Sequence, residues 1–253
     1  MPFIKEKFPT YNAFALASLS DVYGSALEKA EKFEANTLGT GIFWNEGTGS
    51  DGQPVFKYQP LDRIAQVAPA FGTVAADVDG DGLTDLLLAQ NFHSPQIETG
   101  HYDGGLGQLL LNRGKRHFEP VPAGLSGIVM PRDSKAATVS DLDGDGVGDL
   151  VVTTNNGPCA ALLNRDADPS RFVRVVLPLQ KAAGARVTLA MDGGQSQVQE
   201  YHAGAGYMSQ SPAVLTFGTG SARGPGRLKI QWPDGSVEDR PITASDRVIA
   251  LAR

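Results

Sequence analysis

The sequence predicts a mainly β protein, with β-propeller blades after a short helical segment and before a small β-sandwich-like domain. The 30 glycines and 16 prolines among 253 residues, with runs of Val, Thr and Leu, favour short strands joined by tight turns. A unit of strand, acidic loop and strand occurs twice, at an offset of 64 residues (141 − 77). Such a fixed period indicates a repeat architecture, and four-stranded units repeated radially form a propeller.

The N-terminal stretch at residues 10–35, TYNAFALASLSDVYGSALEKAEKFEA, favours helix. Thr10 can cap a first helix, Gly24 interrupts the pattern, and Ser25 can cap a second helix. One face of the second helix would be apolar, formed by Ala26, Leu27, Ala30 and Phe33. We therefore assign residues 1–36 to a helical N-terminal segment.

The repeated units fill residues 37–178, with about two complete blades and one partial blade. Each unit ends in a strand–turn–strand piece that contains phenylalanine, seen in GIFWNEGTGSDGQPVFKY, QLLLNRGKRHFEPV and ALLNRDADPSRFVRV. A propeller typically needs at least four blades, and an open arc would leave strand edges unpaired. We therefore expect the missing blades to come from upstream sequence or from another copy of the chain.

A separate small β domain is predicted over residues 184–253, where the repeat stops. Apolar and polar residues alternate there, with Val187, Leu189 and Met191 on one strand face and Leu228, Ile230 and Trp232 on another. Asp-Gly pairs at 192–193 and 234–235 are typical of hairpin turns. Two layers of such strands would form a sandwich.

The two acidic loops, DVDGDGLTD at 77–85 and DLDGDGVGD at 141–149, have the ligand spacing of a calcium loop. Calcium loops offer oxygens at positions 1, 3, 5, 7 and 9, with a backbone carbonyl at position 7. The predicted ligands are Asp77, Asp79, Asp81, Leu83 and Asp85 in the first loop, and Asp141, Asp143, Asp145, Val147 and Asp149 in the second. Hard oxygen ligands without Cys or His favour Ca²⁺ over Zn²⁺.

These loops are not EF-hands, because position 12 holds Leu88 or Val152 where that motif needs a bidentate Glu. The alternative is a pair of solvated acidic turns. Two carboxylates 4–5 Å apart repel by about 3–4 kcal/mol at an effective dielectric of about 20, so a folded cluster favours a bound cation. We therefore predict two Ca²⁺ sites whose ions have a structural and not a catalytic role.

Two stretches resemble known families. FGTVAADVDGDGLTDLLLAQN and AATVSDLDGDGVGDLVVTTNNG are similar to the FG-GAP/VCBS repeats of integrin-type β-propellers. GARVTLA, YHAGAGYMSQSPAVLTFGTG and LKIQWPDGSVE resemble the ASPIC/UnbV domain, which follows such repeats in cartilage-acidic-protein-like proteins. The family's Phe-Gly-Leu-Gly is Phe-Gly-Thr-Gly here, at 217–220. The resemblance implies a C-terminal fragment of a longer, exported chain with a calcium-loaded, seven-bladed propeller, roles in adhesion, and no carried-over catalytic residue.

A polar linker, NFHSPQIETGHYDGG, follows the first loop and is a second candidate site. Its side chains could bind a transition metal or act as a general base, or could simply be solvated; they are Asn91, His93, Glu98, His101 and Asp103. Cys159 lies among strand-like residues, so we expect it to be buried and inert. Trp44 and Trp232 are expected to pack against neighbours and not to bind sugar.

The composition argues against several classes of function. The net charge of −6 argues against nucleic acid, the single cysteine excludes an intrachain disulfide, and no stretch has the about 20 apolar residues of a membrane span. The first residues, MPFIKEKFPTYNAFALASLSD, make a poor signal peptide, yet weak calcium sites fill readily only where calcium is abundant. We therefore expect an extracellular, periplasmic or cell-surface location, with the leader outside this stretch of sequence, and a cytoplasmic location is the alternative.

The leading interpretation is a calcium-binding adhesion or binding module with a protein or glycan ligand. One alternative is an enzyme of a secreted or biosynthetic pathway, with a site in the propeller funnel or the 91–103 linker. Another is a purely structural domain of a larger surface protein. An enzyme would show a pocket where at least two titratable groups converge, whereas a binding module would show a rim-like surface with exposed aromatic residues.

Overall fold

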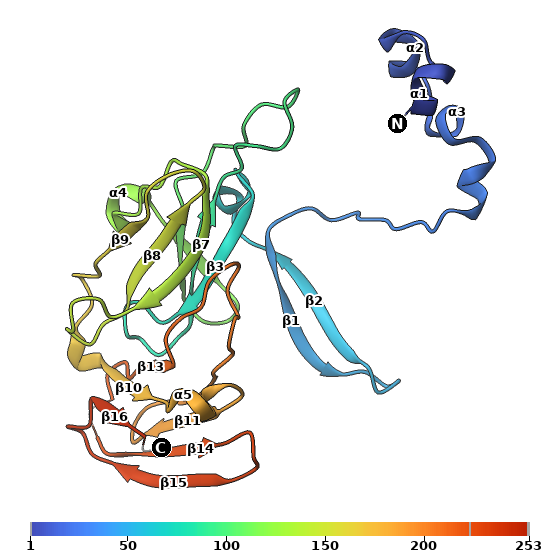
Figure 1. Cartoon of the computed structure of the whole chain (residues 1–253). Helices are drawn as coiled ribbons and strands as arrows, with labels where there is room; N and C mark the ends of the chain where they lie inside the picture. Colours follow the sequence, from blue (N-terminus) through green and yellow to red (C-terminus); the bar gives the residue numbers. More distant parts are fainter. Residues whose placement is uncertain (1, 223, 252–253) are drawn as a thin grey trace. The chain divides into compact units, whose positions relative to one another are not determined.

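A computed structural model describes residues 2–222 and 224–251 (Figure 1). The chain divides into two compact units, one ending at Leu38 and one beginning at Gly39. Strands dominate the second unit, so the prediction of a mainly β protein with a short helical N-terminal segment is confirmed.

The first unit consists of short helices, which are α1 (Pro2–Lys7), α2 (Tyr11–Ala15), α3 (Leu19–Tyr23) and the 3-10 helix η1 (Gly24–Lys29). The Thr10 hydroxyl accepts from the Ala13 N–H at 3.1 Å, so the predicted cap is confirmed. The predicted second helix with its Ser25 cap is wrong, because Gly24–Lys29 is a 3-10 helix whose N-cap position is Tyr23 without a side-chain cap. Beyond Lys29 the chain is irregular and Phe33 is exposed. An exposed phenylalanine gives this segment no buried face to hold it helical. Among the described residues, no helix is long and apolar enough to cross a membrane.

The second unit begins with a hairpin of β1 (Gly41–Thr48) and β2 (Pro54–Pro60), followed by η2 (Arg63–Gln66). Trp44 on β1 stacks on Phe118, with ring centroids 6.3 Å apart, and the Arg116 guanidinium lies 5.0 Å from its ring centroid. Trp44 therefore packs against its neighbours, as predicted.

The first acidic loop belongs to an antiparallel sheet of β3 (Ala70–Ala76), β4 (Asp85–Gln90), β5 (Gln108–Asn112) and β6 (Phe118–Val121), in that order. The β5–β6 turn is tight because Gly114, Lys115 and Arg116 all have positive φ, at 75°, 50° and 64°. Helix α4 (Ala123–Ser126) then leads to the second sheet.

The second acidic loop belongs to a three-stranded sheet of β7 (Ser134–Ser140), β8 (Asp149–Thr154) and β9 (Ala160–Leu162). The predicted outer strand of this unit is wrong, because β10 (Phe172–Val176) pairs with β13 and β16 of the C-terminal domain. Pro169 opens a 3-10 turn, η3 (Pro169–Arg171), and none of the residues 163–171, all described, has positive φ. Without the left-handed turn of the first sheet, the chain leaves the second sheet before a hairpin can form.

The two sheets share an apolar core. Val74 and Leu87 from the first sheet pack with Leu150 and Val152 from the second, and Met130 from the connection completes the cluster. The strands that flank both acidic loops are therefore fixed relative to one another.

The C-terminal domain is a two-layer sandwich (Figure 1). One sheet has the order β13-β10-β16, and the other has the order β12-β11-β14-β15. Helix α5 (Leu179–Ala182) precedes the remaining strands, which are β11 (Arg186–Met191), β12 (Ser196–Glu200), β13 (Val214–Gly218), β14 (Gly226–Gln231), β15 (Val237–Ile242) and β16 (Val248–Ala250). Val175 and Phe217 from the first layer pack with Leu189 and Ile230 from the second, all fully buried. Trp232 is also buried in this core, so its predicted packing role is confirmed.

Cys159 is exposed, so the prediction of burial is wrong. It follows the exposed Gly157 and Pro158 in the connection between β8 and β9, and β9 begins only at Ala160. A Gly-Pro pair favours a turn and gives no ladder N–H at proline, which keeps the cysteine out of the sheet.

Candidate metal centres

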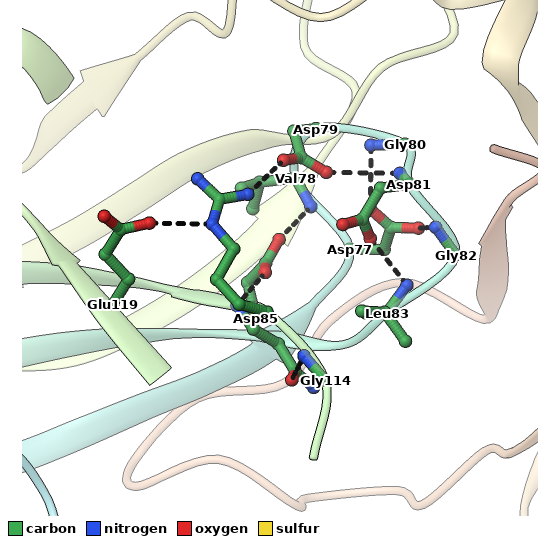
Figure 2. A network of polar contacts seen from close by, with 12 residues as sticks. Asp77, Val78, Asp79, Gly80, Asp81, Gly82, Leu83, Asp85, Gly114 and Glu119 are labelled. Atoms are coloured by element: carbon green, nitrogen blue, oxygen red, sulfur yellow. Dashed lines mark hydrogen bonds and ion pairs between the residues drawn. The ribbon is translucent and has the colours of Figure 1, made fainter. Parts of the chain in front are cut away.

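The first acidic loop is closed by its first aspartate (Figure 2). The Asp77 carboxylate accepts from the N–H groups of Gly80 and Gly82, both at 2.7 Å. These two glycines have φ of 72° and 93°, in the left-handed region that side chains disfavour. The glycines therefore let backbone donors turn inward around one carboxylate.

The last aspartate of the loop, Asp85, ties the loop to its sheet. It is 1% exposed, and its two oxygens accept from the N–H of Val78 at 2.9 Å and of Asn112 at 2.8 Å. Val78 lies at the start of the loop and Asn112 at the end of β5. One buried carboxylate thus holds the loop entrance and the third strand together.

The second loop repeats this arrangement. The Asp141 carboxylate accepts from the N–H groups of Gly144 (2.7 Å) and Gly146 (3.1 Å). The Asp149 carboxylate accepts from the N–H groups of Leu142 (2.8 Å) and Asn164 (2.9 Å). The residues at positions 2, 7 and 8 differ between the loops, so the shared conformation follows from the aspartates and the glycines that both loops contain.

Each loop brings three carboxylates together. One oxygen each from Asp77, Asp79 and Asp85 lies within 4.8 Å of the others, and Asp141, Asp143 and Asp149 form the same group in the second loop. Asp81 and Asp145 lie outside these groups, and their carboxylates accept from the N–H of Leu83 (2.7 Å) and Val147 (2.8 Å). The backbone carbonyls of Leu83 and Val147 stay predicted ligands. A donor set of carboxylate oxygens alone fits a hard cation such as Ca²⁺.

Two arginines lie near the loop carboxylates and were not predicted from the sequence. Arg113 Nη1 lies 3.6 Å from Asp79 Oδ2, and Arg165 Nη1 lies 2.6 Å from Asp143 Oδ2 (Figure 2 shows the first loop). Both arginines follow an asparagine at or just beyond the end of the third strand of their sheet, in a repeated Leu-Asn-Arg. That repeat was the available signal, because equivalent positions in equivalent units meet equivalent loop residues.

The C-terminal sandwich also contacts both loops. Arg174 on β10 bonds to Asp141 Oδ2 at 2.6 Å, and the side-chain exposures of the pair are 20% and 4%. At the first loop, the Gly220 N–H donates to the Gly80 carbonyl at 2.9 Å. A Cβ atom on Gly218 would lie 1.8 Å from Asp77 Oδ2, so only glycine fits there. Both loops therefore lie at the junction with the sandwich.

Burial shifts the acidity of the first loop. Desolvation raises the pKa of Asp77 to about 6 and that of Asp85 to about 7, although backbone hydrogen bonds oppose the shift in both cases. Burial likewise raises the pKa of Asp81. Without a cation, Asp77 and Asp85 therefore ionise at a higher pH than an exposed aspartate does.

The polar linker contains a different cluster. His93, His101 and Asp103 offer ligand atoms within 4.8 Å of one another. Asn91 is fully buried, and its amide bonds to both the N–H and the carbonyl of Gly105, so its role is structural. Glu98 is exposed and lies outside the cluster.

Comparison with known proteins identifies the C-terminal part. Residues 178–253 match the family model described as ASPIC and UnbV. The predicted resemblance of this segment is thereby confirmed, and the match covers most of the sandwich, from just after β10. The FG-GAP/VCBS resemblance of the repeated sheets stays a prediction.

The chain is also similar to cartilage acidic protein 1 from three vertebrates. The Xenopus tropicalis protein is 23% identical over 208 residues, covering 78% of this chain and 30% of the relative. The Mus musculus protein is 25% identical over 198 residues, covering 73% and 28%. The Homo sapiens protein is 25% identical over 114 residues, covering 43% and 17%. The chain thus spans less than a third of the length of these relatives.

Proposed function

We propose that the chain is a calcium-stabilised binding module that works outside the cytoplasm. The observation that carries the proposal is the repeated loop arrangement, in which two separate sequences gather carboxylates with the same hydrogen bonds. Carboxylates so close together repel one another, and a divalent cation relieves that repulsion.

Charge balance supports a cation in each loop. The first loop has four aspartates and one paired arginine, Arg113, at 3.6 Å. The second loop has four aspartates and two arginines, Arg165 and Arg174, each at 2.6 Å. Both loops keep excess negative charge, and the second keeps less. We therefore expect the first loop to bind Ca²⁺ more tightly at pH 8, where protons no longer compete.

The ion's proposed role is structural. Bound by the loop carboxylates, Ca²⁺ would supply positive charge that holds the end of β3 to the start of β4, and the end of β7 to the start of β8. We further propose that the two sheets are FG-GAP/VCBS-type blades, which their shared core and 64-residue repeat (141 − 77) support.

The extracellular and adhesive role is proposed from the similarity to cartilage acidic protein 1. It is consistent with weak calcium loops, since sites with Kd of about 10⁻⁴–10⁻³ M fill in extracellular fluid. The partner would be a protein or glycan. Immobilised chain should bind such ligands in 2 mM Ca²⁺ and release them in EGTA, whereas binding that ignores EGTA would contradict a calcium-dependent module.

Calorimetric titration tests the metal assignment. The EGTA-stripped chain should bind two Ca²⁺ at pH 8, and Asp79→Asn and Asp143→Asn should each bind one. Both substitutions keep the Oδ1 acceptor for the loop N–H, so the turn can form without the charge. The matched control is Asp51→Asn, in an Asp-Gly turn with a single aspartate, which should still bind two. A parent that binds no Ca²⁺ at millimolar concentration, or variants that keep both sites, would refute the assignment.

A further inference from the structure

A small two-stranded ribbon forms between β4 and β5. Phe92 and Tyr102 make an isolated antiparallel bridge, and each N–H donates to the other's carbonyl at 2.9 Å. His93 and His101 are the next residues outward, so the bridge sets them opposite one another. Their rings are nearly parallel, at an interplanar angle of 5°, with centroids 4.8 Å apart.

Asp103 completes a cluster on the same face. It lies two residues beyond His101, and side chains at that spacing share a face of an extended strand. Ligand atoms of His93, His101 and Asp103 lie within 4.8 Å of one another. Three ligands of two kinds therefore converge on a backbone whose register is fixed.

One atom in the cluster lacks an evident partner. His93 Nε2 is buried and makes no hydrogen bond to any residue that the structure describes. A buried nitrogen without a partner typically destabilises a protein by about 1–3 kcal/mol, and such an atom calls for an explanation. The His93 backbone N–H bonds to the buried Asp133, which anchors this residue. His93 is thus the fixed member, and the exposed His101 and Asp103 are free to adjust.

We propose that His93, His101 and Asp103 bind a divalent transition metal ion, with Zn²⁺ the best fit, at a site separate from the acidic loops. Imidazole and carboxylate together suit Zn²⁺, whereas Ca²⁺ takes oxygen ligands only. A tetrahedral Zn²⁺ with bonds of about 2.0–2.1 Å holds its ligand atoms about 3.4 Å apart. The His101 ring must therefore tilt out of its stack so that the nitrogens converge.

The surroundings favour a cation. The nearby Lys135 ammonium pairs with Asp133, donates to the Asn91 carbonyl at 2.9 Å, and lies 3.5 Å from the Phe71 ring centroid. The positive charge of Lys135 is thus paired with groups outside the cluster, while Asp103 brings a negative charge to the site. Three protein ligands leave a fourth position of Zn²⁺ open for water or for a partner's side chain.

Zinc titration of the untagged full chain tests the site. Binding of Zn²⁺ is measured by calorimetry with and without 2 mM Ca²⁺, and Co²⁺ provides a visible absorption band that reports nitrogen ligation. The test variants are His101→Ala and Asp103→Asn, both at exposed positions. The matched control is His202→Ala, because His202 is also exposed and lies 3.7 Å from a carboxylate, that of Glu200. Thermal melting verifies that each variant folds.

The expected result is one Zn²⁺ bound independently of Ca²⁺. His101→Ala and Asp103→Asn should each weaken it by more than the about 10–100-fold typical of losing an outer-shell partner, and His202→Ala should leave it unchanged. The proposal is overturned if the parent takes up no Zn²⁺ at 0.1 mM, if either test variant binds like the parent, or if the control weakens binding equally. Loss of zinc binding by Ca²⁺ competition would also overturn it, because that places zinc in the acidic loops.

Discussion

The Arg174–Asp141 ion pair joins the sandwich to the second acidic loop, and Arg174→Met tests what the pair contributes. The substitution keeps the length of the side chain but removes the charge that faces a carboxylate with only 4% exposure. Breaking a buried pair by removing one partner destabilises a protein by about 3–5 kcal/mol. Since Arg174 itself is 20% exposed, we take the lower end, about 3 kcal/mol in EGTA.

Calcium should reduce this loss to about 1 kcal/mol or less, because a bound cation supplies Asp141 with positive charge. Urea unfolding in EGTA and in 5 mM Ca²⁺ measures both values. With a slope of about 3 kcal/mol per molar urea, the EGTA midpoint should fall by about 1 M. The control is Arg227→Met, whose ion pair with Asp239 is exposed and should contribute about 0–1 kcal/mol in either buffer. The reasoning fails if Arg174→Met lowers the free energy of unfolding in EGTA by no more than this control does, or lowers it by the same amount in both buffers.

Four further outcomes are expected. Gly218→Ala should lower the free energy of unfolding by about 1–3 kcal/mol in urea, because its Cβ would lie 1.8 Å from Asp77, whereas Gly124→Ala, with no atom within 4 Å, should be neutral. The calcium affinity of the first loop should fall when the pH is lowered from 8 to 5.5. Burial raises the pKa of Asp77 to about 6 and that of Asp85 to about 7, so Ca²⁺ must displace protons at the lower pH. A calcium affinity that is independent of pH would contradict this expectation. Because these pKa values are higher in the folded than in the unfolded chain, the calcium-free fold still binds protons at a pH where the unfolded chain has released them. The free energy of unfolding without calcium should therefore decline as the pH rises from about 4 to 7. Cys159 should react with a thiol reagent in the native state as fast as in urea, and strong protection would show that it is covered.

The sequence predicted the parts of the fold that depend on local chemistry. Asp-Gly alternation can adopt few backbone conformations, because glycine alone accepts φ near 90° without strain and a short carboxylate reaches nearby N–H groups. Gly82 and Gly146 accordingly take almost the same φ, 93° and 94°. Strand alternation likewise predicted that Leu189 and Ile230 face a core, since period two leaves one face to bury.

What the sequence could not predict depends on contacts between distant segments. Phe172–Val176 has the alternation of a blade strand, and only pairing with β13 and β16 decides that it belongs to the sandwich. The partners of Arg174 and of Gly218 follow from that docking and leave no local pattern. Arg113 and Arg165 could have been found, since their repeated position after asparagine is visible in the sequence.

The position of the acidic loops has a thermodynamic consequence for the whole second unit. Asp141 is both a predicted metal ligand and the partner of Arg174, and Asp77 lies directly against Gly218. If the affinity of a ligand for these carboxylates differs between the docked and the undocked sandwich, ligand binding must change the free energy of docking by the same amount. At the second loop, a cation and Arg174 compete for one oxygen of Asp141, so calcium binding should loosen that ion pair while tightening the loop. At the first loop the sandwich presents the backbone of Gly218 and Gly220. The nearby Arg171 acts electrostatically on Asp81, which lies outside the group of three carboxylates that would hold the cation. The two loops share a sequence motif but should therefore couple differently to the sandwich, with calcium binding and the Arg174 contact opposing one another only at the second loop.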